Sequence, residues 1–161
     1  MADFIRQQGA AFLAHLLRRL SDDLVRGGSE WYPEVGVTAA PRTTSTLLAL
    51  AERGPLGVTE IADILRQSHP LVITWLRQLK ADGFIRQRAD SKDKRRTVVA
   101  LTAKGASEVT RLREALRTMR VASQRLMDDA APGLMDALWK MEQACRDTPF
   151  AQQLRKQAKS R

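Results

Sequence analysis

Residues 59–105 read TEIADILRQSHPLVITWLRQLKADGFIRQRADSKDKRRTVVALTAKG, and this stretch decides the fold. Apolar residues recur at spacings of three and four in two short runs, one in residues 61–65 and one through Val72, Leu76 and Leu79. This spacing is typical of helices that bury one face. The stretch therefore predicts two short helices in succession.

Capping residues mark the expected ends of these two helices. Thr59 can cap the first helix through its hydroxyl, and the apolar pattern breaks near Gln67. Ser68 is expected to cap the second helix. Pro70 stands in the first turn, where the N–H that proline lacks would have no hydrogen-bond partner within the helix, so it does not destabilise the helix. Gly83 is expected at the C-terminal cap.

After Gly83 the sequence period falls towards two. Residues 84–88 and 97–101 are predicted to be strands, joined by a polar turn over residues 90–95. A two-stranded hairpin is marginal alone, so it must pack on the neighbouring helices. Two short helices followed by a basic hairpin are the order of a winged helix-turn-helix, which predicts that the chain reads double-stranded DNA.

Amphipathic helices are expected on both sides of this segment. Residues 3–26 carry an apolar stripe that Gly27-Gly28 is expected to end, and residues 29–42 are expected to be an ordered loop before a short helix at 44–53. Thr102 can cap a long helix that precedes a break at Pro132. The long helix carries a seam at spacings of three and four, formed by Val109, Leu112, Leu116, Met119, Ser123 and Leu126.

The last helix is expected after Pro132, with a basic, frayed end at residues 155–161. Its inward face is predicted to hold Leu134, Leu138, Met141 and Cys145.

The predicted fold class is mainly α with a small antiparallel β wing. One compact chain is divided into an N-terminal dimerisation helix and loop (1–40), the winged helix-turn-helix (41–104) and C-terminal dimerisation helices (105–161). A buried aliphatic side chain contributes about 1.5 to 3 kcal/mol, so the exposed stripes need a partner. The expected dimer interface comprises Phe12, Leu16, Val109, Leu112, Leu116, Met119, Leu138 and Met141.

Composition favours a polyanionic partner, because 27 Lys and Arg stand against 18 Asp and Glu, with a net charge of +9 and a pI of about 10.6. Charge alone does not choose between nucleic acid and a membrane surface, but no apolar stretch approaches the roughly 20 residues that span a bilayer. One cysteine, Cys145, excludes an intrachain disulfide, and the first residues lack an apolar signal core. A cytoplasmic location is expected, with no membrane partner.

The outer face of the second helix is the candidate base-reading surface, because a helix fits the major groove. Arg77 is suited to a guanine or a phosphate, while Pro70 and Ile73 could touch thymine methyls; the alternative is that Ile73 belongs to the core. The predicted recognition residues are Ser68, His69, Pro70, Ile73, Thr74, Arg77 and Gln78.

The hairpin carries nearly half of the net charge, with six cations against two carboxylates. An arginine at a hairpin tip can enter the minor groove, and Asp93 could aim the guanidinium of Arg95; the alternative is a solvated charged turn. The cations are Arg86, Arg88, Lys92, Lys94, Arg95 and Arg96, and the carboxylates are Asp90 and Asp93. The predicted wing contacts are Arg88, Lys92, Asp93, Lys94, Arg95 and Arg96.

The stretch from Leu47 to Gly105 resembles the MarR family of bacterial transcription regulators. The motifs that carry the likeness are Ile61-Ala62, Ser68, residues 76–79, Ala81-Asp82-Gly83-Phe84-Ile85, Asp90, Asp93-Lys94-Arg95-Arg96 and Leu101-Thr102-Ala103-Lys104-Gly105. The resemblance implies a homodimer formed by the terminal helices, recognition helices in successive major grooves, and a wing arginine in the minor groove. It maps that arginine onto Arg95 and its aiming carboxylate onto Asp93.

Many members of this family carry Thr-Arg where this chain has Ile73-Thr74, and a further arginine where it has Gln78. Direct guanine readout is therefore expected to be reduced, with a preference for half-sites that contain A·T pairs. The resemblance also implies release from DNA by a small aromatic or lipophilic effector. His15, Trp31 and Tyr32 are candidate neighbours of its pocket, although loop aromatics are more often structural anchors.

Catalysis is not expected. The chain has no phosphate-cradling glycine motif and no Cys-x-x-Cys pair, and His15, His69 and Cys145 are too scattered for a zinc site. We therefore expect no metal and no cofactor. Cys145 lies on an apolar stripe, so a buried inert thiol is favoured over a redox sensor.

Together these patterns predict a sequence-specific regulator, a repressor that binds a pseudo-palindromic operator as a homodimer and is released by an effector. The alternative is a winged-helix module that binds protein through Pro70, Ile73 and Trp75, which an exposed Trp75 would favour. Nonspecific architectural binding of DNA is a third interpretation.

The wing assignment predicts that Arg95→Ala weakens binding to duplex DNA. Loss of one phosphate-neutralising cation should also flatten the plot of log affinity against log salt by about one unit of slope. A titration of a labelled duplex at several NaCl concentrations measures both quantities. Equal affinity and equal slope for the two proteins would count against the assignment.

Overall fold

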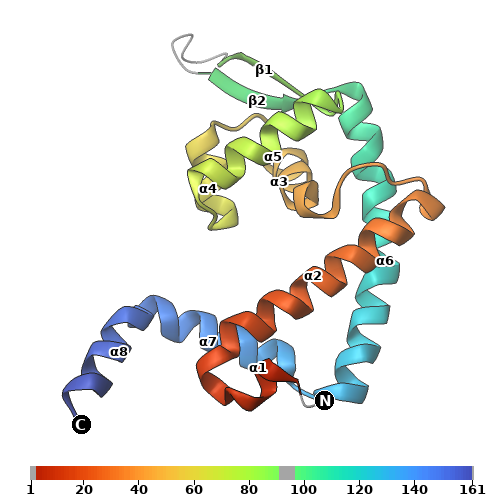
Figure 1. Ribbon diagram of the computed structural model, residues 1–161. Coiled ribbons are helices and arrows are strands. Elements are labelled where there is room, and N and C mark those ends of the chain that lie inside the picture. The colour runs from red at the N-terminus through yellow and green to blue at the C-terminus, as the bar shows by residue number, and fades with distance from the viewer. Residues whose placement is uncertain (1–2, 91–96, 161) are drawn as a thin grey trace. The chain divides into compact units, whose positions relative to one another are not determined.

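A computed structural model describes residues 3–90 and 97–160 of the chain (Figure 1). The fold is mainly helical with one two-stranded antiparallel sheet, as the sequence predicts. The chain forms two compact units, Met1–Ala115 and Leu116–Arg161. Among the described helices, none combines the length and the apolar content needed to cross a bilayer.

The first unit begins with helices and ends with a hairpin and the start of a long helix. Its elements are α1 (Phe4–Gln7), the 3-10 helix η1 (Gly9–Phe12), α2 (Leu13–Trp31), the 3-10 helices η2 (Tyr32–Val35) and η3 (Pro41–Thr43), α3 (Thr44–Arg53), α4 (Val58–Leu65), α5 (His69–Ala81), β1 (Ile85–Ala89), β2 (Thr97–Leu101) and the first half of α6 (Ala103–Ala130).

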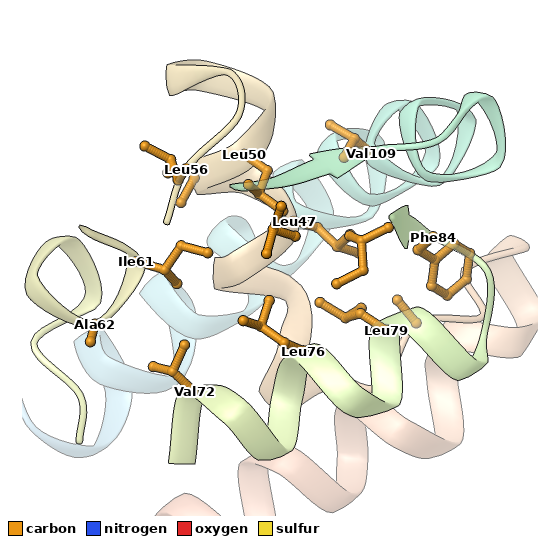
Figure 2. Packing of buried hydrophobic residues seen from close by; sticks show 14 residues of the cluster. Leu47, Leu50, Leu56, Ile61, Ala62, Val72, Leu76, Leu79, Phe84 and Val109 are labelled. Carbon is orange, nitrogen blue, oxygen red and sulfur yellow. The ribbon is translucent and has the colours of Figure 1, made fainter. Parts of the chain in front are cut away.

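The core lies between α3, α4, α5, the hairpin and α6 (Figure 2). The predicted inward stripe of α5 is confirmed, because Val72, Leu76 and Leu79 are buried and meet Leu47 of α3. Trp75 is half-buried and packs against the same cluster. This core fixes the opposite face of α5 towards solvent.

The hairpin is formed by the pairing of its two strands and is attached to the core by a separate backbone bridge. β1 pairs antiparallel with β2, with Arg86 opposite Ala100 and Arg88 opposite Val98. Leu56, which precedes α4, then exchanges both backbone hydrogen bonds with Val99, at 3.0 and 2.8 Å. The extra bridge supplies the support that a two-stranded sheet lacks alone.

The junction between the hairpin and α6 is tightly packed. The Thr102 hydroxyl accepts the Gly105 N–H at 3.0 Å, so the predicted cap of α6 is confirmed, and it donates to the carbonyl of Gly83 at 2.7 Å. Gly83 takes φ = 76° directly after α5, as expected of a residue just beyond a helix end. A Cβ at Gly105 would collide with the carbonyl oxygen of Phe84, so only glycine fits there.

The N-terminal part differs from the prediction. Gly9 has φ = 59° and interrupts the single helix expected over residues 3–26. Gly27 and Gly28 do not end α2, which continues to Trp31. Gly28 is buried beside η3, where a Cβ added to it would meet Pro41 Cγ at an ordinary contact distance of 3.5 Å. The expected loop over 29–42 is therefore partly helical.

The start of α4 also differs from the prediction. Gly57 occupies the N-cap, and the Glu60 carboxylate accepts its backbone N–H at 2.7 Å. Thr59 lies inside the helix and is not its cap. The end near Gln67 is as predicted, because Arg66 takes the left-handed conformation at φ = 51°.

The second unit contains the rest of α6, α7 (Leu134–Asp147) and α8 (Phe150–Lys159). α8 replaces the frayed end that the sequence suggested, and it follows a break at Thr148-Pro149. None of the described residues in this unit is buried. The single chain leaves the predicted inward face of α7 uncovered: Met141 and Cys145 are exposed, and Leu134 and Leu138 are half-buried.

One buried carboxylate ties the chain before α3 to α6. Glu108 of α6 has no exposed surface, and it accepts the backbone N–H groups of Thr38 and Ala39 at 2.5 and 2.7 Å. Arg111 donates to its other oxygen at 2.6 Å. Burial alone would raise the pKa of Glu108, but these hydrogen bonds outweigh burial and hold the pKa below its usual value.

Replacing Glu108 should therefore cost stability. Glu108→Ala leaves two amide N–H groups without their acceptor, and we expect the free energy of unfolding at pH 7 to fall by about 2–4 kcal/mol. Urea unfolding measures this difference, with Glu52→Ala, at an exposed position of α3, as the control expected within about 0.5 kcal/mol.

The same network gives a pH dependence. Because the pKa of Glu108 is lowered in the folded chain, its contribution is complete above the unfolded carboxyl pKa of about 4.3 and is lost as the pH falls through the folded value. The deficit of Glu108→Ala should shrink over that range. A deficit that is independent of pH would contradict this account.

Candidate nucleic-acid interface

The recognition residues predicted on α5 and its cap are all exposed: Ser68, His69, Pro70, Ile73, Thr74, Arg77 and Gln78. Ile73 retains 45% of its surface, which removes the alternative that it belongs to the core. Pro70, Ile73, Thr74 and Arg77 follow at helical spacing and form one outward ridge. Half-buried Trp75 lies towards the core, so it lacks the exposure that the protein-binding alternative requires.

Two of the exposed side chains on α5, Thr74 and Gln78, form hydrogen bonds within their own helix. The Thr74 hydroxyl donates to the carbonyl oxygen of Pro70 at 3.0 Å. The Gln78 amide nitrogen donates to both carboxylate oxygens of Asp82, each at 3.0 Å. These side chains are therefore held against their own helix in the free protein.

Arg77 differs from these two side chains. Within residues 3–90 and 97–160, no carboxylate lies at ion-pair distance from its guanidinium. Its five donors remain available for a guanine edge or a phosphate. Ser68 is likewise unused at the helix start, because its hydroxyl makes no capping bond to the described residues although it occupies the N-cap.

The hairpin extends the basic surface beside α5 (Figure 1). Arg86 and Arg88 are exposed on β1, and across the described strands they have no ion-pair partner. Lys80 of α5 donates to the side-chain oxygen of Gln87 at 3.3 Å and links the helix to the strand. No pattern in the sequence predicts this contact between Lys80 and Gln87. The remaining predicted wing residues, Lys92, Asp93, Lys94, Arg95 and Arg96, lie outside the described residues.

The three candidate effector residues are not brought together. His15 stacks on Phe12 with ring centroids 4.6 Å apart, whereas Trp31 contacts Tyr32 at 6.3 Å. Sixteen residues of one helix separate His15 from Trp31, which corresponds to about 24 Å. The prediction of one pocket lined by all three is therefore wrong.

Tyr32 is an anchor within the chain. Its ring is buried, and burial raises the pKa of its hydroxyl, opposed by a hydrogen bond with Thr44. This outcome agrees with the structural alternative for a loop aromatic.

The predicted dimer residues fall into two groups. Leu16 and Met141 are exposed, while the half-buried members are Phe12, Leu116, Met119 and Leu138. Val109 and Leu112 are buried inside the first unit and have no surface left for a partner. They do not belong to the dimer surface, because the core of the same chain covers them.

Residues 41–97 match the model of the MarR family. The matching segment covers 57 of the 161 residues, and over it the chain is similar to the MarR family. The match spans η3, α3, α4, α5 and β1, and it therefore contains every predicted recognition residue and Arg88. The predicted dimer and effector residues lie outside it.

Solved structures show the same fold. S. aureus MepR in complex with DNA is 23% identical, with a TM-score of 0.65 over 82% of this chain and 97% of that one. The transcriptional repressor CouR bound to a 23-mer DNA duplex is 24% identical, with a TM-score of 0.63 over 83% and 92%. Bordetella bronchiseptica BpsR, whose DNA binding is regulated by 6-hydroxynicotinic acid, is 21% identical, with a TM-score of 0.64 over 84% and 94%. No curated protein matches the chain.

Over this segment the chain is similar to a family of DNA-binding transcriptional regulators. The fold class predicted from the sequence is confirmed. The exposed ridge of α5 and the basic strand β1 are the parts of the described chain suited to DNA binding.

The geometry predicts that Arg77→Ala weakens duplex binding by about 5- to 150-fold, the range that corresponds to 1–3 kcal/mol. Fluorescence anisotropy with a labelled duplex measures the change. Arg113→Ala is the matched control, because Arg113 is exposed on α6 away from the ridge. Equal losses for both variants would mean that general charge, and not this position, determines affinity.

Proposed function

We propose that this chain is a sequence-specific repressor that binds a pseudo-palindromic operator as a homodimer. The observation that carries the proposal is the outward ridge of α5, where Arg77, without an ion-pair partner among the described residues, lies beside apolar and hydroxyl side chains. An α-helix that presents such groups fits the major groove. Arg86 and Arg88 on the adjoining strand are placed to neutralise backbone phosphates.

Exposed apolar side chains support the homodimer. α2 exposes Leu13, Leu16, Leu17, Leu20 and Leu24, and the second unit exposes Val121, Leu126, Met135, Trp139, Met141, Phe150 and Leu154. Exposed apolar patches of this kind mark interaction surfaces. The second unit has no buried residue among those described, so a partner would supply its core.

These observations support the division of the chain into a DNA-binding segment, 41–104, and dimerising segments, 1–40 and 105–161. The buried cluster lies almost wholly within the first of these. In a two-fold dimer, the two α5 helices would meet half-sites about one helical turn apart.

Repression and release by a small lipophilic or aromatic effector are the remaining parts of the proposal. CouR is a repressor, and 6-hydroxynicotinic acid regulates DNA binding by BpsR. Both proteins share the fold of this chain. The separation of His15 from Trp31 and Tyr32 means that an effector would contact only one of these two regions.

The test is selection of duplexes from a randomised library by the purified full chain, followed by footprinting and measurement of molar mass by light scattering. The proposal expects an enriched inverted repeat and the mass of two chains. A monomeric mass, or enrichment without any repeat, would contradict it. Equal retention of selected and random duplexes would indicate nonspecific architectural binding.

A charge on the proposed dimer surface should break the dimer. Leu16 is 47% exposed in the single chain, and in the proposed dimer the interface would cover it. Leu16→Glu would then bury an unpaired carboxylate, so we expect the molar mass of a monomer and at least about tenfold weaker operator binding. Ile64→Glu is the matched control, because Ile64 is 44% exposed and lies in α4, outside the dimerising segments 1–40 and 105–161. Dimers formed equally by both variants would exclude this surface.

A further inference from the structure

The ridge of α5 has few free hydrogen-bond donors for base edges. The hydroxyl of Thr74 is bound to Pro70, and the amide of Gln78 is bound to Asp82. Adenine recognition by a glutamine needs the side-chain oxygen and nitrogen together, and the nitrogen of Gln78 is already engaged. Beyond the helix start at Ser68 and His69, base reading along α5 therefore rests on Arg77 and on apolar contact.

Ile73 is the apolar group in the right position for such contact. It lies four residues before Arg77, and 45% of its surface is left exposed by the described chain. Pro70, three residues earlier, adds a second apolar surface on the same side. An exposed β-branched side chain gains apolar burial only when a partner covers it.

We propose that Ile73 reads the C5-methyl group of a thymine in each half-site of the operator, with Arg77 bound to a neighbouring guanine or phosphate. This inference rests on the proposed function. The thymine methyl is the apolar group that the major groove offers, and it distinguishes T·A from C·G at the same position. Four residues of helix rise by about 6 Å, close to two base-pair steps of about 3.4 Å, so Ile73 and Arg77 can reach base pairs about two steps apart.

The experiment starts from the duplex selected above and replaces each thymine of its consensus, one position at a time, by deoxyuridine. This exchange removes one methyl group and keeps every base-pairing hydrogen bond. At the position read by Ile73, wild-type affinity should fall about fourfold per half-site, the value expected for one buried methyl or methylene group.

Variants identify the residue that reads the methyl. Ile73→Ala should bind the thymine duplex about as weakly as wild type binds the deoxyuridine duplex, and it should show no further loss with deoxyuridine. Leu71→Ala is the matched control, because Leu71 is 39% exposed on the other flank of α5, and it should keep the full response to deoxyuridine. Thermal unfolding monitored by circular dichroism checks that both variants fold, as expected for exposed positions.

The outcomes separate the two proposals. A selected inverted repeat whose binding ignores every thymine-to-deoxyuridine exchange overturns the role of Ile73 and leaves the regulator intact. An undiminished deoxyuridine response in Ile73→Ala assigns the methyl contact to another residue and also overturns this inference. If no duplex is enriched, the proposed function fails, and the inference fails with it.

Discussion

The buried carboxylate of Glu108 is the contact on which the arrangement of the first unit depends. It holds the backbone at Thr38 and Ala39, immediately before η3 and α3, against α6. The segment that leads into η3 and α3 is thereby fixed to the first part of α6. Removing a charge from water is costly, and two backbone amides with Arg111 offset that cost here. The outward direction of α5 follows, because α5 packs on the core that this contact closes.

Two parts of the chain obtain stability in different ways. The segment from α3 to the start of α6 has a continuous apolar core, and the hairpin joins it through Leu56 and Val99. The segment after Ala115 has helices without a buried residue among those described, with Trp139 and Phe150 largely in solvent. Under the proposed function, the surface that reads DNA and the surface that binds a second copy of the chain would therefore lie in different segments.

The sequence predicted the part of the fold that local signals encode. The two helices, the positive φ of Gly83 and the cap at Thr102 depend on residues near each other in the chain, and all are present in the structure. The role of Glu108 could not be predicted, since its partners lie about 70 residues earlier in the chain and no local pattern reveals them. The exposed face of α5 was predictable from helical period, whereas the internal bonds of Thr74 and Gln78 depend on side-chain conformations that the period does not specify.

The contact at Gly105 has a mechanical consequence. With the Phe84 carbonyl directly over this glycine and Thr102 bonded across to Gly83, the start of α6 has no room to pivot against the base of the hairpin. Within the first unit, the start of α6 and the two strands must therefore move together. Any shift of the hairpin relative to α5 would have to carry the first turns of α6 with it.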